Sequence, residues 1–175
     1  MMATETPLIY TIGHSTHPIE VFLEMLQTYH IEMLVDIRSL PGSRKFPQYD
    51  KENLELVLPA NQIEYFYLKE LGGRRKVNRD SHNTNWRKDS FRAYADYMET
   101  EAFENGILKL EDLARMNRVA FMCAEAVWWR CHRSMVADYL KVQGWVVLHI
   151  LSKTKVEPHP YTSAAREENG KLFYF

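Results

Sequence analysis

The sequence predicts an α/β protein, a single three-layer domain over residues 1–175 with a mostly parallel central sheet of about five strands and helices on both faces. Short apolar runs that indicate buried strands alternate with segments whose apolar residues recur at helical spacing. Such alternation is typical of a parallel sheet covered on both faces. The chain is also long enough to bury a sizeable core, and no linker of different composition divides it.

The strands are predicted from apolar runs bounded by turn residues. Each run holds five or six residues, mainly β-branched, aromatic or large aliphatic, which is too short for an ordinary helix. The expected strands cover residues 8–12, 33–37, 63–68, 118–122 and 145–150.

The helices are predicted from apolar stripes that lie between the strands. One begins near Pro18, which suits the first turn because its missing N–H would have no partner there. Further helices are expected from residue 50 or 51 to about 58, from about 90, from about 102 to 114, and from about 131 to 143. Gly144 is the expected C-cap of the last helix. The polar stretch over residues 69–88 has a length that is often functional in a compact domain.

Composition and charge exclude several classes of function. The formal net charge of −1 provides no general field for nucleic acid or anionic membranes, so such binding would need a local patch. The first seven residues lack the features of a signal peptide, and no apolar run approaches the roughly 18 residues of a membrane span. Two cysteines in such a chain favour free thiols over a disulfide. We therefore expect a cytoplasmic protein with no membrane partner.

Polar residues follow most of the predicted strands. Right-handed crossovers bring all strand-to-helix loops to one edge of a parallel sheet, where open α/β sheets bind ligands. Arginine is frequent in these loops, so we expect a small anionic ligand there. The residues expected to bind it are Gly13, Ser15, Asp36, Arg38, Ser43, Arg44, Gly73, Arg74, Cys123 and Arg133. The alternative is that several arginines pair with Asp36, Glu70 or Glu125.

Cys131 is the predicted nucleophile. It lies at the expected start of a helix, flanked by Arg130, His132 and Arg133, and such a setting lowers the pKa of a thiol. The alternative is that Cys131 packs as a small apolar residue under its helix. Its candidate catalytic partners for proton transfer are Glu125, His14 and His132.

The neighbouring groups have structural alternatives of their own. Cys123 ends a buried strand and is expected to belong to the core rather than to react. Glu125 follows the same strand, so it is either salt-bridged or a proton carrier with a raised pKa. The turn that contains His14 could instead cap the next helix through Ser15 or Thr16.

A metal site is a weaker prediction. The side chains of Cys123, Glu125, Cys131 and His132 offer sulfur, oxygen and nitrogen donors, but their spacing matches none of the usual zinc ligand pairs. We therefore expect no metal, and the sequence leaves the cofactor open.

Five separated motifs resemble a known family. They are Tyr-Thr-Ile-Gly-His-Ser at residues 10–15, Val-Asp-Ile-Arg at 35–38 with Pro41 and Ser43, Leu-Gly-Gly at 71–73, Cys-Ala-Glu at 123–125 and Cys-His-Arg at 131–133. In this order they are similar to the bacterial and archaeal family called domain of unknown function 488. Many relatives carry a proline between the glutamate and Cys-His-Arg, where this chain has the bulkier residues 127–130. The resemblance supports the fold and the site without defining a reaction.

Two classes of function follow from these observations. The favoured one is an enzyme that acts on a phosphorylated or nucleotide-like small molecule, with Cys131 as nucleophile and Arg38 and Arg133 as anion clamps. The alternative is a nucleic-acid-binding or repair-associated module. In that module the same arginines would contact phosphate while bases stack on Trp86, Trp128, Trp129 or Phe46. The apolar segment 172–175 should dock on its own domain or on a second copy of the chain, so a homodimer is also a candidate assembly.

Overall fold

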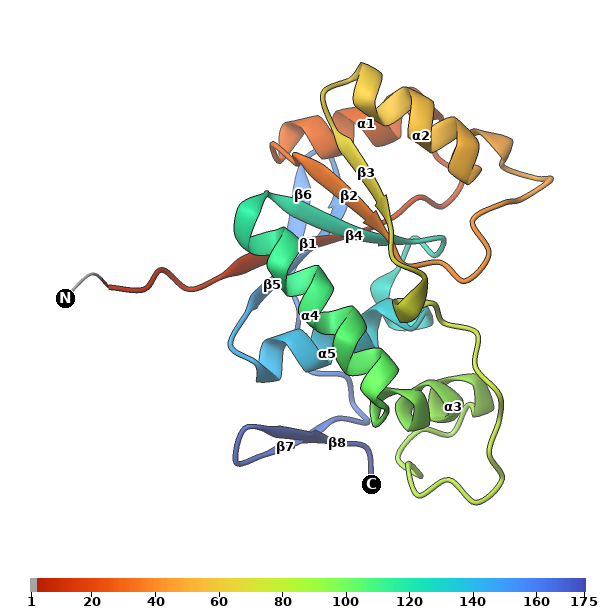
Figure 1. Cartoon of the computed structure of the whole chain (residues 1–175), viewed down its shortest axis with the longest axis vertical. Helices are drawn as coiled ribbons and strands as arrows, with labels where there is room; N and C mark the ends of the chain where they lie inside the picture. The colour runs from red at the N-terminus through yellow and green to blue at the C-terminus, as the bar shows by residue number, and fades with distance from the viewer. Residues whose placement is uncertain (1–2) are drawn as a thin grey trace.

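The computed structural model describes residues 3–175 and consists of a central sheet with helices on both faces (Figure 1). Within those residues the sheet has six strands in the order β3-β2-β4-β1-β5-β6. All neighbouring pairs are parallel except β5 and β6. The strands are β1 (Leu8–Gly13), β2 (Met33–Asp36), β3 (Glu64–Tyr67), β4 (Val119–Cys123), β5 (Val146–Ser152) and β6 (Lys155–Pro158).

The helices divide between the two faces of the sheet. In Figure 1, α1 and α2 lie on one side of the strands, whereas α4 and α5 lie on the other, with α3 beyond α4. A separate antiparallel hairpin, β7 (Arg166–Glu168) and β8 (Lys171–Phe173), lies near the C-terminus. The helices are α1 (Ile19–Thr28), α2 (Lys51–Ala60), α3 (Asp89–Met98), α4 (Glu101–Met116) and α5 (Arg133–Val142).

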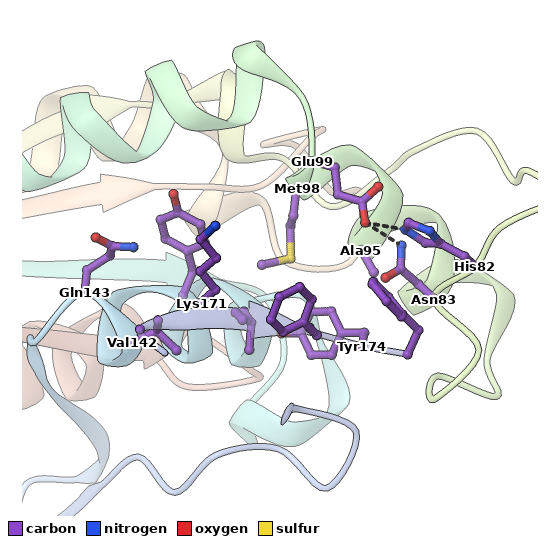
Figure 2. Close-up of a pocket in the computed structure, with 14 residues that line it drawn as sticks. His82, Asn83, Ala95, Met98, Glu99, Val142, Gln143, Lys171 and Tyr174 are labelled. Carbon is purple, nitrogen blue, oxygen red and sulfur yellow. Dashed lines mark hydrogen bonds and ion pairs between the residues drawn. The ribbon is translucent and has the colours of Figure 1, made fainter. Parts of the chain in front are cut away.

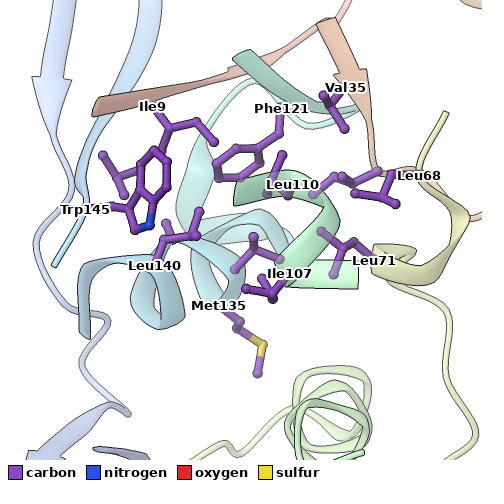
Figure 3. Packing of buried hydrophobic residues seen from close by; sticks show 14 of the residues in the cluster. Ile9, Val35, Leu68, Leu71, Ile107, Leu110, Phe121, Met135, Leu140 and Trp145 are labelled. Carbon is purple, nitrogen blue, oxygen red and sulfur yellow. The ribbon is translucent and has the colours of Figure 1, made fainter. Parts of the chain in front are cut away.

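Each face of the sheet has its own hydrophobic core. Successive strand residues point to opposite faces, so Phe121 packs toward α4 and α5 while Met122 packs toward α1 and α2. Figure 3 shows the first core, in which Phe121 faces Leu110 of α4 and Leu140 of α5. Every residue of β4 is buried, as expected of a central strand covered on both sides.

The α/β class and the mostly parallel sheet are confirmed. The five expected strands are all present. The C-cap of α5 is Gln143 rather than Gly144, and Gly144 follows it with a left-handed φ of +93°. The helix expected from Cys131 begins instead at Arg133, and Pro18 is the N-cap of α1 rather than its first residue. The sixth strand and the β7–β8 hairpin are absent from the prediction. Within residues 3–175, no helix combines the length and the apolar character that a membrane span needs.

The topology creates a crevice at the carboxyl ends of β1 and β4. These two strands are neighbours, yet the helix after β1 crosses one face toward β2 and the helix after β4 crosses the other face toward β5. The two connections therefore diverge from adjacent strand ends. Ligands of open α/β sheets bind at such switch points.

Candidate functional site

The loop after β4, residues 124–132, folds over the carboxyl end of β1. The backbone N–H groups of His14 and Ser15 donate to the carbonyls of Cys123 and Ala124 at 3.1 and 2.9 Å. A Cβ on Gly13 would lie 1.7 Å from the backbone oxygen of Glu125, so only glycine permits this approach. Gly13 therefore acts by letting the loop pack against β1.

Two adjoining hollows occupy the crevice. The thiol-side cleft has a volume of about 440 Å³ and includes both cysteines in its lining. The histidine-side cleft has a volume of about 550 Å³ and includes His14. Arg38, Glu125 and Arg130 line both, so the two clefts are parts of one depression.

Most of the residues predicted from sequence meet at this depression. Arg44 is exposed and lies outside both sets of lining residues, and Arg133 is buried behind the loop. The predicted residues that line one or both clefts are His14, Ser15, Arg38, Ser43, Gly73, Arg74, Cys123, Glu125, Cys131 and His132.

Arg38 is held in a paired cluster, defined here as His14, Asp36, Arg38, Tyr49 and Tyr65. Arg38 donates from Nε and Nη2 to the two carboxylate oxygens of Asp36 at 2.9 and 2.8 Å, and from Nη2 to the carbonyl of Tyr49 at 2.7 Å. The Tyr65 hydroxyl donates to the same carboxylate at 2.6 Å. Both charged side chains are buried, so Asp36 neutralises Arg38 and is itself an internal partner rather than a ligand-binding group.

His14 completes the paired cluster as a neutral imidazole. Its Nδ1 donates to the carbonyl of Ser15 at 2.9 Å, which leaves Nε2 to accept from Nη1 of Arg38 at 3.3 Å. Burial lowers its pKa to about 4, and the charge of Arg38 adds to this effect. The suggested cap of α1 by Ser15 or Thr16 is wrong, because Pro18 is the N-cap and no side chain caps it. Near pH 7, His14 therefore orients Arg38 and is poorly suited to accept a proton.

The two cysteines are in direct contact. Their Sγ atoms lie 2.8 Å apart, and both are buried free thiols. Burial opposes the thiolate of Cys123, but a hydrogen bond from Cys131 and the charge of Arg133 outweigh it and lower the pKa of Cys123 to about 7. Burial and the neighbouring Cys123 raise the pKa of Cys131 well above its usual value. The predicted low pKa of Cys131 is therefore wrong, and Cys123 is the thiol that favours the charged form.

Arg133 is a buried cation with incomplete pairing. Its side chain is 1% exposed, and Nη2 donates to the carbonyls of Glu125 and Ala126 at 3.2 and 3.3 Å. Within residues 3–175 its Nε and Nη1 have no hydrogen-bond partner, and no carboxylate forms an ion pair with it. We name Cys123, Cys131 and Arg133 the thiol cluster. Arg133 supports the loop from behind and supplies positive charge to Cys123.

His132 is also neutral and held by its surroundings. Its Nε2 donates to the carbonyl of Ile37 at 2.9 Å, and burial lowers its pKa to about 4. A Cβ on Gly73 would lie 2.5 Å from the Nδ1 atom, so Gly73 gives the ring its space. Gly73 is thus a packing residue, and His132 joins the loop to β2.

The open side of the thiol-side cleft is positively charged. Arg74 and Lys88 come from the long polar loop, and Arg130 comes from the short 3₁₀ turn Trp128–Arg130. All three side chains are exposed, and Glu125 is the one carboxylate among the described lining residues. Such a surface suits a phosphate or carboxylate.

A buried chain of hydrogen bonds beneath the loop escaped the sequence prediction. Thr11 donates to Nδ1 of His149 at 2.5 Å, His149 Nε2 lies 2.8 Å from Nδ1 of His159, and His159 Nε2 lies 2.8 Å from Asp138. The Tyr174 hydroxyl also donates to Asp138 at 2.8 Å, which docks the C-terminal segment on its own domain. The four polar residues come from separate segments of the chain, so no local pattern connects them.

A third hollow lies away from the sheet edge. Its volume is about 360 Å³, between α3, α5 and the C-terminal hairpin. Figure 2 shows an apolar floor with Tyr174 and Met98, and at one end the carboxylate of Glu99 paired with His82 and Asn83. None of the residues predicted for the site lines it. Within residues 3–175 no group of three or more His, Cys, Asp or Glu side chains could hold a metal ion.

Comparison with known proteins identifies the family. A family model described as Domain of unknown function DUF488 matches residues 18–140, more than half of the chain, and the chain belongs to this family. The match contains β2, β4, the loop over residues 124–132 and both cysteines, so it confirms the resemblance drawn from the motifs. Searches of curated proteins and of solved structures return no match.

Proposed function

We propose that this DUF488 protein is a cytoplasmic enzyme that acts on a small phosphorylated or nucleotide-like molecule, with Cys123 as its nucleophile. One observation carries the proposal. A thiol whose pKa is lowered to about 7 borders a cleft whose open side presents Arg74, Lys88 and Arg130. The free thiols also suit a reducing compartment.

The residues that line the clefts have separate roles in the proposed hydrolysis of a phosphate ester. The three exposed cations bind the phosphate oxygens, and the thiolate of Cys123 attacks phosphorus. A sulfur–phosphorus bond forms while the bond to the leaving oxygen breaks, and Glu125 gives that oxygen a proton. Water then attacks phosphorus, returns a proton to Glu125 and releases phosphate and the thiolate. Glu125 takes the acid–base role because it is exposed in both clefts, whereas His14 and His132 are neutral and already hydrogen-bonded.

Substitutions separate binding from chemistry. Arg130→Ala should weaken inorganic phosphate binding about tenfold or more, because a hydrogen bond to a charged group contributes about 1.5–3 kcal/mol. Cys123→Ser should abolish hydrolysis of p-nitrophenyl phosphate while phosphate still binds. Arg115→Ala is the matched control, since Arg115 is an exposed arginine of α4 outside both clefts. Calorimetry that detects no phosphate binding by the unaltered protein would refute the proposal.

Trp129 supports a second candidate function, the binding of single-stranded nucleic acid. It is 51% exposed and lines the histidine-side cleft together with Phe46 and Arg130. Trp128 is buried against His149, and Trp86 is partly buried and packs against the core outside both clefts, so Trp129 is the best placed of the three for a base. This function requires binding of a short oligonucleotide that weakens steeply as salt increases. Equal binding at low and high salt would count against it.

A further inference from the structure

The two thiols meet in a geometry that is close to that of a covalent bond. Cys123 ends β4 and Cys131 precedes α5, yet their sulfur atoms lie 2.8 Å apart. A disulfide needs about 2.05 Å between sulfurs, so the two atoms would have to approach by a further ~0.8 Å. The start of the loop between the two cysteines is fixed to β1 by the backbone bonds of His14 and Ser15, and Arg133 donates to the next two carbonyls of the loop, those of Glu125 and Ala126.

The charge around the pair favours one attacking thiol. A buried guanidinium without a carboxylate partner is costly, and the nearby group that can supply negative charge to Arg133 is the Cys123 thiol. Arg133 also favours the thiolate of Cys131, but burial and the neighbouring Cys123 outweigh it and raise the pKa of Cys131, since a second thiolate beside the first would add like charge. The arrangement therefore gives one nucleophilic sulfur and one neutral thiol in contact with it.

We propose that Cys123 and Cys131 form a reversible redox pair, in which a hydroperoxide oxidises Cys123 and Cys131 resolves the product to an intramolecular disulfide. The proposal rests on the proposed function only in naming Cys123 as the nucleophile of the same site. Both cysteines are among the residues that line the thiol-side cleft, and the proposal brings a small oxidant to them from this side.

The chemistry consists of two balanced steps. In the first, the thiolate of Cys123 attacks the terminal oxygen of the hydroperoxide. The oxygen–oxygen bond breaks, the alkoxide leaves and takes a proton from water, and Cys123 becomes a sulfenic acid. In the second, the sulfur of Cys131 attacks that of Cys123 and the sulfur–oxygen bond breaks. Hydroxide leaves with the proton of Cys131 as water. Two thiols lose two electrons in total, and the hydroperoxide is reduced to an alcohol and water.

Formation of the disulfide changes the cleft. It removes the negative charge that faces Arg133 and takes away the nucleophile, so the proposed hydrolysis stops until a thiol reductant restores the pair. Cys131 thereby protects Cys123 from further oxidation to sulfinic and sulfonic acids, which reductants do not reverse.

Mass spectrometry of the intact full-length protein tests the pair, with hydrogen peroxide as the probe. The unaltered protein should lose the mass of two hydrogens and regain it with dithiothreitol. Peptides that contain residue 123 should gain one oxygen and then more in the Cys131→Ser variant, and Cys131 should stay unmodified in the Cys123→Ser variant; oxygen gained by the eight methionines is scored separately. Stepwise gain of oxygen at Cys123 of the unaltered protein, or a disulfide between two molecules, would overturn the proposal.

A second measurement does not depend on the variants. The unaltered protein is alkylated before and after peroxide treatment, and its peptides are mapped. Both thiols should be labelled before treatment and neither after, with residues 123 and 131 recovered in linked peptides. Phosphate binding by the reduced protein separates this proposal from the previous one. Disulfide formation without phosphate binding refutes only the proposed function, whereas phosphate binding without a disulfide refutes only the redox pair.

Discussion

Arg38 and Arg133 lie at the same edge of the sheet and differ in how their charges are balanced. Arg38 is 7% exposed, and both carboxylate oxygens of Asp36, the carbonyl of Tyr49 and the ring of His14 accept its hydrogen bonds. Arg133 is 1% exposed, but only its Nη2 atom has partners within the described residues. Tyr49 and Tyr65 of the paired cluster pack in the core under α1 and α2, whereas Arg133 of the thiol cluster is the first residue of α5.

This difference in the pairing of the two arginines indicates different roles for the two clusters. A buried cation that is fully paired stabilises one geometry and leaves little capacity for a ligand. A buried cation without a carboxylate acts on whichever nearby group can ionise, which here is Cys123. Incomplete pairing is therefore the physical reason why reactivity is expected at the thiol cluster and structural support at the paired cluster.

Acid should destabilise the fold through three buried histidines, of which His14 belongs to the paired cluster, and this is the largest expected effect. Burial lowers the pKa to about 4 for His14 and His132 and to about 2 for His149. In the unfolded chain these residues bind protons below about pH 6.5, while the folded protein keeps them neutral. Stability is thus fully present above that pH and falls as pH decreases toward 4. The slope should reach about 4 kcal/mol per pH unit, or about 1.4 for each histidine.

Urea denaturation across this pH range measures the slope. The His14→Gln and His149→Gln variants should each lower it by about a third, since each removes one of the three protonations. If unfolding free energies stay constant between pH 6.5 and 4.5, the neutral state assigned to these three histidines is wrong.

Breaking the ion pair between Asp36 and Arg38 should cause the next largest loss of stability. Asp36→Asn keeps the shape of the side chain but leaves Arg38 buried without its counter-ion, at a cost of about 3–5 kcal/mol. The matched control is Asp112→Asn, which breaks an exposed pair with Arg115 and should cost less than about 1 kcal/mol. Equal shifts of the urea midpoint for the two variants would show that Asp36 is not the stabilising partner.

Removing Arg133 should change the reactivity of Cys123 more than it changes stability, whereas Asp36→Asn should mainly change stability. Arg133→Met breaks no ion pair with a carboxylate but removes the hydrogen bonds to the carbonyls of Glu125 and Ala126, so stability should change by about 2 kcal/mol or less. The pKa of Cys123 should rise by about one unit, and its alkylation at pH 7 should slow about tenfold. Arg130→Met removes an exposed charge from the same loop and should have a smaller effect because solvent screens it. An unchanged pH profile for Arg133→Met would separate Arg133 from thiol reactivity.

The comparison also shows which features the sequence could predict. The strands, the helices and the edge that carries the site follow from periodicity and right-handed crossovers, which depend on local pattern. The pairing of Arg38 with Asp36 could be suggested from the sequence, since Asp36 is two residues away in the same segment. The order of the two thiol pKa values could not be predicted, because it depends on where Arg133 and Cys131 lie around Cys123 after folding. The same holds for the buried chain from Thr11 to Asp138, whose members are brought together by three different elements and a loop.

Trp129→Ala should give the smallest change in stability of these substitutions. It therefore tests what the open side of the crevice contributes to ligand binding. The ring is 51% exposed and touches Trp128 edge to face at a centroid distance of 5.3 Å, so its loss should change unfolding by about 0.5 kcal/mol or less. A base stacked on an aromatic ring contributes about 1–3 kcal/mol, so a nucleotide that uses Trp129 should bind about tenfold more weakly to the variant. Inorganic phosphate, which has no base, should bind both proteins equally. Equal weakening of AMP and phosphate would exclude base stacking at Trp129, because only an altered charged surface reduces both alike.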